Sequence, residues 1–482
     1  MKFKIFAKKI DSEDIEVFYY DNMKNSLSDK DGVEFKYKDI LLDPNAKTFT
    51  AFNAQNPIGK SREVNRVKIQ LGLSCNYSCD YCSQKFVERA PETSKKDIDA
   101  FIEKFKNLKF KEEEGLRVEF WGGEPLVYWK TLKPLAEAIR EEFKDWKIKP
   151  QFSMITNGSI LTDEMIDWLM MMDFNVSISH DGPGQSVRGP DPFDDPETKE
   201  RILGFYRMMS RLKKPFSFNS MLNSKNTSRK AIYDWFVNLT GDENIQLGEG
   251  GIVDAYDEDG VTNSLITKKD HFNFRKQAFG EIYASEGKIG FNSILLKAFY
   301  FGQSILNQQP ADLLGQKCGM DDSRNIAIDL RGNVITCQNV SAAETAMNGN
   351  SHKIGTLDDI DNIQLNTSTH WSSRPHCSEC PVLHLCKGAC MFLEGKYWET
   401  SCSNSYSDNI ALFSLVFTEL TGGYVPFMIE SDTLPDDRKD IWGDILVHEE
   451  TKRKIIPIKV VAEKVGEIDD VTVYGKSRIE SV

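Results

Sequence analysis

Short apolar runs alternate with amphipathic stretches through the middle of the chain. Within the amphipathic stretches, apolar residues recur every three to four positions, which predicts helices that bury one face, as in residues 94–109 behind a Ser94 cap. The apolar runs predict six strands, at residues 66–74, 117–123, 151–158, 174–183, 215–222 and 245–254. Repeated strand–helix units predict an α/β fold with its chemistry at the carboxyl ends of parallel strands. Six units predict a partial (β/α)6 TIM-like barrel that is open on one side.

The pattern predicts four regions. Residues 1–64 look β-rich and polar, and no motif assigns them a role. The barrel is expected over residues 65–300, and a cysteine-rich extension over residues 301–420. Residues 421–482 contain "IPIKVV" and "VTVYG", which predict a second small β-rich terminal region.

Composition narrows the functional classes. With 482 residues, 40% hydrophobic and 28% charged, the chain has the make-up of a soluble globular protein of two or three domains. The formal net charge of −13 and the lack of a stripe dense in Lys and Arg argue against nucleic acid as a partner. The first residues lack the apolar core of a signal peptide, and the longest apolar runs are too short to span a bilayer. We therefore expect a cytoplasmic protein with no membrane partner.

The ten cysteines are clustered, and in the cytoplasm such clusters are more often metal ligands or catalytic thiols than disulfides. Cys75, Cys79 and Cys82 stand together directly after the first predicted strand, and the next cysteine is Cys318. Three thiolates on a 4Fe–4S cluster leave one iron without a protein ligand, so that iron can bind a small molecule. The alternative is three structural or unrelated thiols.

The spacing Cys75-x3-Cys79-x2-Cys82, with Tyr81 before the last cysteine, resembles the motif of the radical SAM enzymes. The resemblance implies that the open iron binds S-adenosylmethionine through its amino and carboxylate groups. It also implies an electron donor such as a flavodoxin or a ferredoxin. The cofactor would then be cleaved to a 5′-deoxyadenosyl radical that abstracts hydrogen from the substrate.

Polar residues at successive strand ends extend this resemblance over residues 65–255. In the family, a Gly-Gly-Glu stretch after the second strand contacts the methionine amino group, and polar residues after the third to fifth strands bind the ribose and carboxylate. Each of these residues alone is typical of a turn or a cap. The cofactor contacts implied here are Tyr81, Gly122, Gly123, Glu124, Thr156, Asn157, Ser177, Ser179, Asp181 and Asn223.

The remaining cysteines resemble the SPASM or twitch extension of radical SAM enzymes that modify peptides. Their pattern is Cys318, then Gly332-x4-Cys337, then Cys377-x2-Cys380-x5-Cys386-x3-Cys390, and finally Cys402. The resemblance implies two auxiliary 4Fe–4S clusters in addition to the first. One would be held by Cys377, Cys380, Cys386 and Cys402, and the other by Cys318, Cys337 and Cys390. The alternative is a zinc ribbon, with His376 and His384 near the cysteines.

Two departures from the family pattern bear on the chemistry. No further thiol lies between Cys318 and Cys337, so the fourth position of that cluster is left to water, to a substrate group or to a carboxylate such as Asp321 or Asp322. Gln338 stands where the sulfatase-maturing relatives carry an aspartate as general base, and an amide cannot accept a proton at neutral pH.

The resemblance to these families implies an enzyme of the radical SAM type that matures a ribosomally made peptide by a thioether or carbon-based crosslink. The catalytic residue is not assigned. Oxidation to formylglycine by sulfatase maturation, or another peptide oxidation or epimerisation, is the alternative reaction. The non-enzymatic alternative is an iron–sulfur electron carrier or a zinc-binding adaptor, which would not need the strand-end residues Gly123, Glu124, Ser179 and Asp181.

Overall fold

The computed structural model describes residues 1–39, 56–285, 287–365 and 369–443. A nine-stranded sheet in the order β10-β9-β8-β7-β6-β5-β11-β12-β13 forms its centre. Six strands of this sheet are parallel and follow one another in sequence order, which confirms the six predicted strands. They are β5 (Arg66–Gln70), β6 (Arg117–Trp121), β7 (Gln151–Thr156), β8 (Phe174–Ser179), β9 (Phe216–Leu222) and β10 (Leu247–Ile252).

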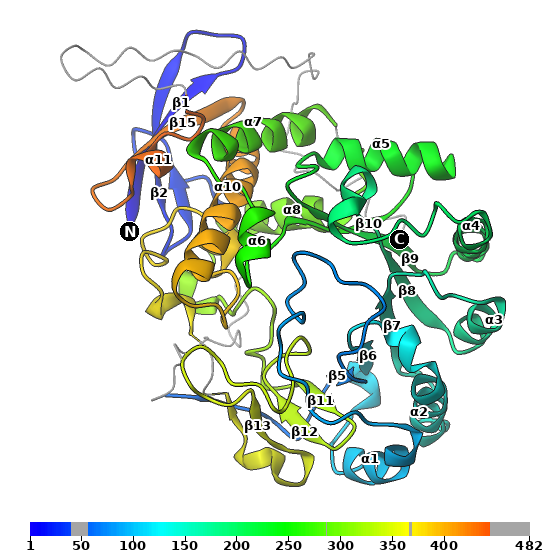
Figure 1. The fold of residues 1–482 in the computed structure, drawn as a ribbon. Coiled ribbons are helices and arrows are strands. Elements are labelled where there is room, and N and C mark those ends of the chain that lie inside the picture. Colours follow the sequence, from blue (N-terminus) through cyan, green and yellow to red (C-terminus); the bar gives the residue numbers. More distant parts are fainter. Residues whose placement is uncertain (40–55, 286, 366–368, 444–482) are drawn as a thin grey trace.

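Five helices connect the parallel strands and lie along the outer side of their arc (Figure 1). They are α1 (Ile98–Phe105), α2 (Trp129–Glu142), α3 (Asp163–Met171), α4 (Pro196–Arg211) and α5 (Arg229–Thr240). Ser94 caps a short 3-10 turn before α1, where its hydroxyl accepts from Lys96 N and the Asp97 side chain completes a capping box. The mixed α/β fold is thus confirmed, whereas the partial barrel stays a prediction.

The two faces of the parallel sheet differ in polarity. On β8, Phe174, Val176 and Ile178 are buried, whereas the intervening Asn175 and Ser177 are only partly buried. The alternation gives the sheet one apolar face, which packs on the helices, and one polar face, which is turned the other way. Candidate site residues therefore collect on the inner face and at the carboxyl ends of the strands.

Strands from the cysteine-rich region continue the same sheet. β11 (Asn325–Asp329) pairs parallel with β5, and β12 (Asn333–Ile335) and β13 (Lys353–Thr356) follow in antiparallel order. Gly332 forms the β11–β12 turn with a φ of +78°, and a side chain there would lie 2.8 Å from Lys104 Cδ. Glycine in the Gly-x4-Cys element is thus explained by a tight hairpin that leads into Cys337.

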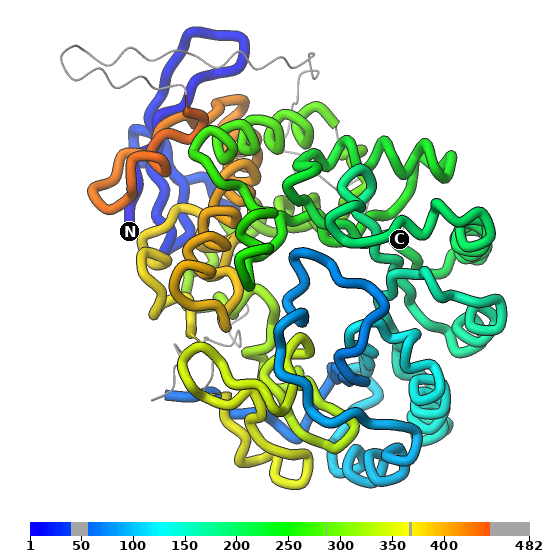
Figure 2. Tube along the Cα trace, viewed as in Figure 1, coloured from blue at the N-terminus to red at the C-terminus, as the bar shows by residue number. Residues whose placement is uncertain are grey.

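The two ends of the described chain share a second sheet, in the order β15-β1-β2-β3. Its strands are β1 (Lys2–Lys9), β2 (Ile15–Asp21), β3 (Ser26–Ser28) and β15 (Tyr424–Glu430). Figure 2 shows the N-terminal strands in blue beside the orange segment that contains β15. The predicted strands at "IPIKVV" and "VTVYG" lie outside the described residues.

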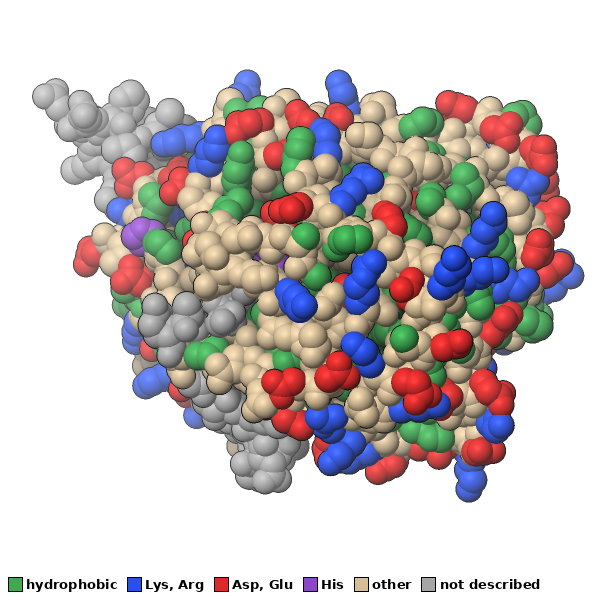
Figure 3. Space-filling model, turned by 60° about the horizontal axis from the view of Figure 1, so that its bottom comes forward, with side chains coloured by type: hydrophobic (Ala, Val, Ile, Leu, Met, Phe, Trp, Pro, Cys, Tyr) green, Lys and Arg blue, Asp and Glu red, His purple; other side chains and the backbone are tan. Residues whose placement is uncertain are grey.

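The remaining elements include a two-stranded sheet of β14 and β4. They are β4 (Ile58–Gly59), β14 (Gln364–Leu365), α6 (Glu258–Thr262), α7 (Lys268–Ala284), α8 (Asn292–Leu306), α9 (Leu383–Cys386), α10 (Gly395–Leu420) and α11 (Asp436–Lys439). The apolar run at 410–417 is the buried part of α10. In the described part of the chain, no helix has the length and apolar character needed to cross a membrane. Acidic and basic side chains are interspersed on the face in Figure 3.

Candidate functional site

The first cysteine triplet lies on the long loop that follows β5 and crosses the middle of the molecule (Figure 2). The three thiols are close enough to affect one another. Burial raises the pKa of Cys79 to about 12, and the nearby Cys82 and Cys75 also raise it. Backbone N–H groups point at two of the sulfurs, with Tyr77 N 3.3 Å from Cys75 Sγ and Gln84 N 3.4 Å from Cys82 Sγ. Hydrogen bonds of this kind stabilise thiolates on an iron–sulfur cluster.

Gly122 and Gly123 bring the end of β6 against this loop. Gly123 N donates to Gly72 O at 3.0 Å, and Glu124 N donates to Ser74 O at 3.0 Å. A side chain at Gly122 would lie 2.5 Å from Gly72 O, and one at Gly123 would overlap Ser74 O. The two glycines are therefore required for the close approach of strand end and loop.

Glu124 joins the ends of two strands from a buried position. Its Oε1 accepts from Leu126 N at 2.9 Å and from Thr156 Oγ1 at 2.6 Å, and its Oε2 accepts from Asn157 N at 2.7 Å. Burial raises the pKa of this carboxyl, and these hydrogen bonds oppose the rise. The expected contact of Glu124 with the cofactor amino group stays a prediction. In the structure, the carboxylate accepts hydrogen bonds from groups of the protein itself.

Asn157 connects β7 to the cysteine loop. Its Nδ2 donates to Asn76 Oδ1 at 2.9 Å, and Asn76 stands directly after Cys75. Asn76 Nδ2 in turn donates to Ser159 Oγ at 2.8 Å. The loop is thereby fixed to a second strand end by side-chain hydrogen bonds.

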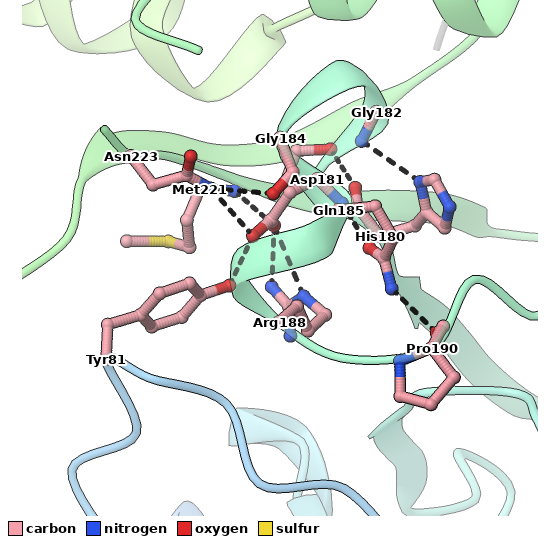
Figure 4. Close-up of polar contacts among 11 residues, drawn as sticks. Tyr81, His180, Asp181, Gly182, Gly184, Gln185, Arg188, Pro190, Met221 and Asn223 are labelled. Atoms are coloured by element: carbon pink, nitrogen blue, oxygen red, sulfur yellow. Dashed lines mark hydrogen bonds and ion pairs between the residues drawn. The ribbon is translucent and has the colours of Figure 1, made fainter. Parts of the chain in front are cut away.

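Asp181 makes the third connection and is fully buried (Figure 4). Its Oδ1 accepts from Arg188 Nη2 at 2.8 Å and from Met221 N at 2.9 Å. Its Oδ2 accepts from the Tyr81 hydroxyl and from Asn223 Nδ2, the latter at 3.3 Å. One carboxylate therefore ties the residue before Cys82 to the ends of β8 and β9.

The sequence pattern predicted that Ser177 and Ser179 follow the fourth strand. Both lie within β8 instead. Ser177 Oγ is 2.6 Å from Ser217 Oγ on β9, and Ser179 is buried at the end of β8. Ser177 thus lies on the polar inner face of the sheet, below the cysteine loop.

Four cysteines from the extension converge on one cavity. Cys377, Cys380, Cys386 and Cys402 line it together with Trp398, Tyr406 and Arg438. Burial raises the pKa of Cys380 to about 12 and also raises that of Cys377. Their sulfurs are thus brought together as the sequence pattern implied, and ionise only when a cation compensates the charge.

The third group consists of Cys318, Cys337 and Cys390. Burial raises the pKa of Cys337 to about 12, with further contributions from Cys318 and Cys390. Burial also raises the pKa of Cys390 to about 11, Asp254 raises it further, and a hydrogen bond with Tyr256 lowers it. The three thiols are therefore close to one another at the carboxyl end of β10.

The two acidic residues suggested for the fourth position of this group have other partners. Asp321 Oδ2 accepts from Gln316 N at 2.8 Å, and Asp322 Oδ1 accepts from Arg324 N at 2.8 Å. Gln338 joins the loop after Cys337 to the inner face of the sheet, because its Oε1 lies 3.2 Å from Lys68 Nζ. Two carboxylates lie near these thiols, since Asp254 raises the pKa of Cys390 and Asp321 raises that of Cys318.

The donor sets consist of cysteine thiols, which fit iron–sulfur clusters. Thiolates on one zinc ion lie about 2.3 Å from the metal, and hence roughly 4 Å from one another. Across the described ranges, no three His, Cys, Asp or Glu side chains gather as ligands of a single ion. In a 4Fe–4S cluster each thiolate binds a different iron, so the sulfurs stand farther apart. His384 Nε2 lies 2.7 Å from Asn22 O, whereas the His376 side chain is 69% exposed and lies at the edge of the four-cysteine cavity.

Four residues of these sites were missed from the sequence: Asn76, Arg188, Asp254 and Arg438. Arg188 had a visible signal, because it ends the stretch "DGPGQSVR" that begins with Asp181. The other three had none, since an isolated loop residue becomes meaningful only when its distant partner is known.

Comparison with known proteins agrees with this geometry. The radical SAM superfamily model matches residues 69–225. The radical SAM cyclopropyl synthase TigE of Paramaledivibacter caminithermalis is 24% identical over 438 residues, which cover 81% of this chain and 85% of that protein. An uncharacterized protein of Methanocaldococcus jannaschii is 24% identical over 156 residues, which cover 32% of this chain and 51% of that protein.

Solved structures share the fold. The structure of native anSMEcpe with bound AdoMet and Cp18Cys peptide has a TM-score of 0.52 and 18% identity, and covers 74% of this chain and 98% of that chain. Native anSMEcpe with bound AdoMet has a TM-score of 0.51 and 17% identity, with the same coverage. Residues 69–225, which carry the first cysteine triplet and the strand-end residues up to Asn223, therefore form a radical SAM domain.

Proposed function

We propose that this protein is a radical SAM enzyme that modifies a peptide. The observation that carries the proposal is the fastening of the Cys75–Cys82 loop to three consecutive strand ends, through Glu124, Asn157 and Asp181. An electron carrier needs only the thiols, whereas a loop fixed at this edge of a parallel sheet provides a site for a second molecule beside the thiols.

The proposed cofactors are S-adenosylmethionine and three 4Fe–4S clusters, of which the one on Cys75, Cys79 and Cys82 would supply, with the bound cofactor, the radical that abstracts hydrogen. The residues of the chain hold and shield that chemistry. Backbone N–H groups orient Cys75 and Cys82, and Asp181 orients the loop through Tyr81. The inner face of the sheet then offers the polar surface on which a peptide backbone can be aligned.

The auxiliary clusters would be held by Cys377, Cys380, Cys386 and Cys402, and by Cys318, Cys337 and Cys390. With three thiols in the second set, a substrate thiolate or the Asp254 carboxylate is the candidate for its fourth position. A flavodoxin or ferredoxin is the proposed electron donor.

For the reaction we favour formation of a carbon-based bond over a thioether, because the relative that matches 81% of the chain is named a cyclopropyl synthase. A peptide is the substrate class to test first, since anSMEcpe, which has the same fold, was solved with a peptide bound. Sulfatase-type oxidation ranks lower, because Gln338 has an amide where a general base is needed and its Oε1 already accepts from Lys68.

The test is cofactor cleavage by the full chain after anaerobic reconstitution. With dithionite and S-adenosylmethionine, the parent protein should form 5′-deoxyadenosine and contain about twelve irons, from three clusters of four. The triple variant Cys75→Ala, Cys79→Ala, Cys82→Ala should form none and lose about four irons.

The matched control is Cys377→Ala, which removes the same kind of thiol from a different site. It should still cleave the cofactor, because its cavity lies outside the first loop. Cleavage by the triple variant would contradict the assignment, and a colourless parent protein loaded with zinc would support the adaptor alternative.

A further inference from the structure

Arg438 lies on α11, beyond the last cysteine of the motif, yet its side chain reaches the cavity of the four cysteines. Its Nη2 donates to Cys402 Sγ at 3.3 Å, and the residue lines the cavity together with Cys377, Cys380 and Cys386. A guanidinium this close to sulfur acts both as a hydrogen-bond donor and as a fixed positive charge.

The position of Arg438 is set by the backbone and by an aromatic ring. The Tyr406 hydroxyl donates to Arg438 O at 2.7 Å, and the guanidinium stands 4.7 Å from the centre of the Tyr406 ring. Arg275 Nη1 donates to Asp437 O at 2.9 Å and so fixes the preceding residue as well. These contacts aim the guanidinium at the cavity and contribute no negative charge.

No carboxylate neutralises Arg438 within ion-pair distance among the residues that the structure describes. Arg438 is partly buried, and a cation withdrawn in part from water without an anionic partner is costly, because burial removes hydration. A neutral thiol on Cys402 offers only a weak acceptor, whereas a thiolate bound to iron offers a negative charge. The charge of Arg438 is therefore matched only when the four cysteines hold an anionic centre.

We propose that Arg438 is the counter-charge of a 4Fe–4S cluster on Cys377, Cys380, Cys386 and Cys402 and raises the reduction potential of that cluster. The inference rests on the proposed function, because it requires iron at this site. Four thiolates around an oxidised core of charge +2 give a net charge of −2, and one added electron gives −3. A fixed cation stabilises the more negative form more strongly, so reduction becomes easier.

The test is an EPR-monitored redox titration of the reconstituted full chain with dithionite as the reductant. Arg438→Met should contain the same number of irons as the parent protein, and one auxiliary midpoint potential should shift to a more negative value. Arg438→Lys keeps the charge but shortens its reach, so its shift should be smaller and in the same direction.

Lys439→Gln is the matched control, since it removes one positive charge from the next residue of the same helix. Lys439 pairs with Asp436 at 3.2 Å and is absent from the cavity lining, so its loss should leave every potential unchanged. If Arg438→Met does not fold, Arg438→Lys alone decides the question.

The outcomes separate the inference from the proposed function. An iron-loaded parent protein whose potentials are the same in Arg438→Met and Arg438→Lys overturns the inference alone. A parent protein that binds zinc at this site overturns the proposed auxiliary cluster and the inference together.

Discussion

At the scale of single residues, the site depends on a few buried carboxylates that hold other parts of the protein in place. Glu124 and Asp181 are both buried, and each accepts hydrogen bonds from more than one strand end. Such groups are stable only while every partner remains, because an unpaired charge in the interior is costly. The sequence predicted that both residues belong to the site, but not that each would have protein donors as partners.

Asp181→Asn should destabilise the protein strongly, because the substitution leaves the charge of the largely buried Arg188 without its anion. Breaking a buried ion pair on one side costs about 3–5 kcal/mol. The free energy of unfolding in denaturant measures the effect. The control is Glu141→Gln, which breaks the exposed ion pair with Lys144 and should change the free energy of unfolding very little. An equal cost for both variants would contradict the role of Asp181.

At the scale of elements, the six parallel strands were predictable and several of their partners were not. A strand buried on one or both faces has an apolar run bounded by turn residues, which is a local signal. The pairing of β11 with β5, and of β15 with β1, joins segments hundreds of residues apart and has no local signal. For the same reason, no local pattern indicated that β15 closes the N-terminal sheet.

The β11–β12 hairpin provides a test at this scale. Gly332→Ala should destabilise the protein by about 1–3 kcal/mol, because it combines a positive φ with a contact against Lys104. Gly349→Ala is the matched control, since Gly349 has a φ of +84° and nothing within 4 Å of the added carbon. The difference between the two thermal midpoints measures the contact alone. The double variant Gly332→Ala, Lys104→Ala should recover that difference, and no recovery would contradict the steric explanation.

At the scale of the whole molecule, buried histidines, among them His352, His370 and His384, link stability to pH. Burial lowers the pKa of His352, His370 and His384 to about 4, against an unfolded value of about 6.5. Between these values the unfolded chain binds more protons than the folded one, so stability falls as the pH drops from about 6.5 to about 4. Each histidine contributes a slope of about 1.4 kcal/mol per pH unit.

The variant His352→Gln should remove one such contribution. Its free energy of unfolding should fall less steeply than that of the parent protein between pH 6 and pH 5, by about 1.4 kcal/mol per unit. Equal slopes in the variant and the parent protein would contradict the lowered pKa of His352.

The position of Arg438 late in the sequence also affects the order in which the cysteine sites can form during synthesis. A ribosome delivers the chain from residue 1 onward, and segments fold as their contacts emerge. The loop at Cys75–Cys82 is held through Tyr81 by Asp181, whose last donor along the sequence is Asn223, so it can be completed while half of the chain is still missing. Arg438 lines the cavity of the four cysteines Cys377, Cys380, Cys386 and Cys402, so this cavity is incomplete until Arg438 has been synthesised. Arg438 lies on α11, which follows β15, and β15 pairs with β1. The centre farthest along the sequence is thus the last of the three to close, and it depends on a strand that was made long before it.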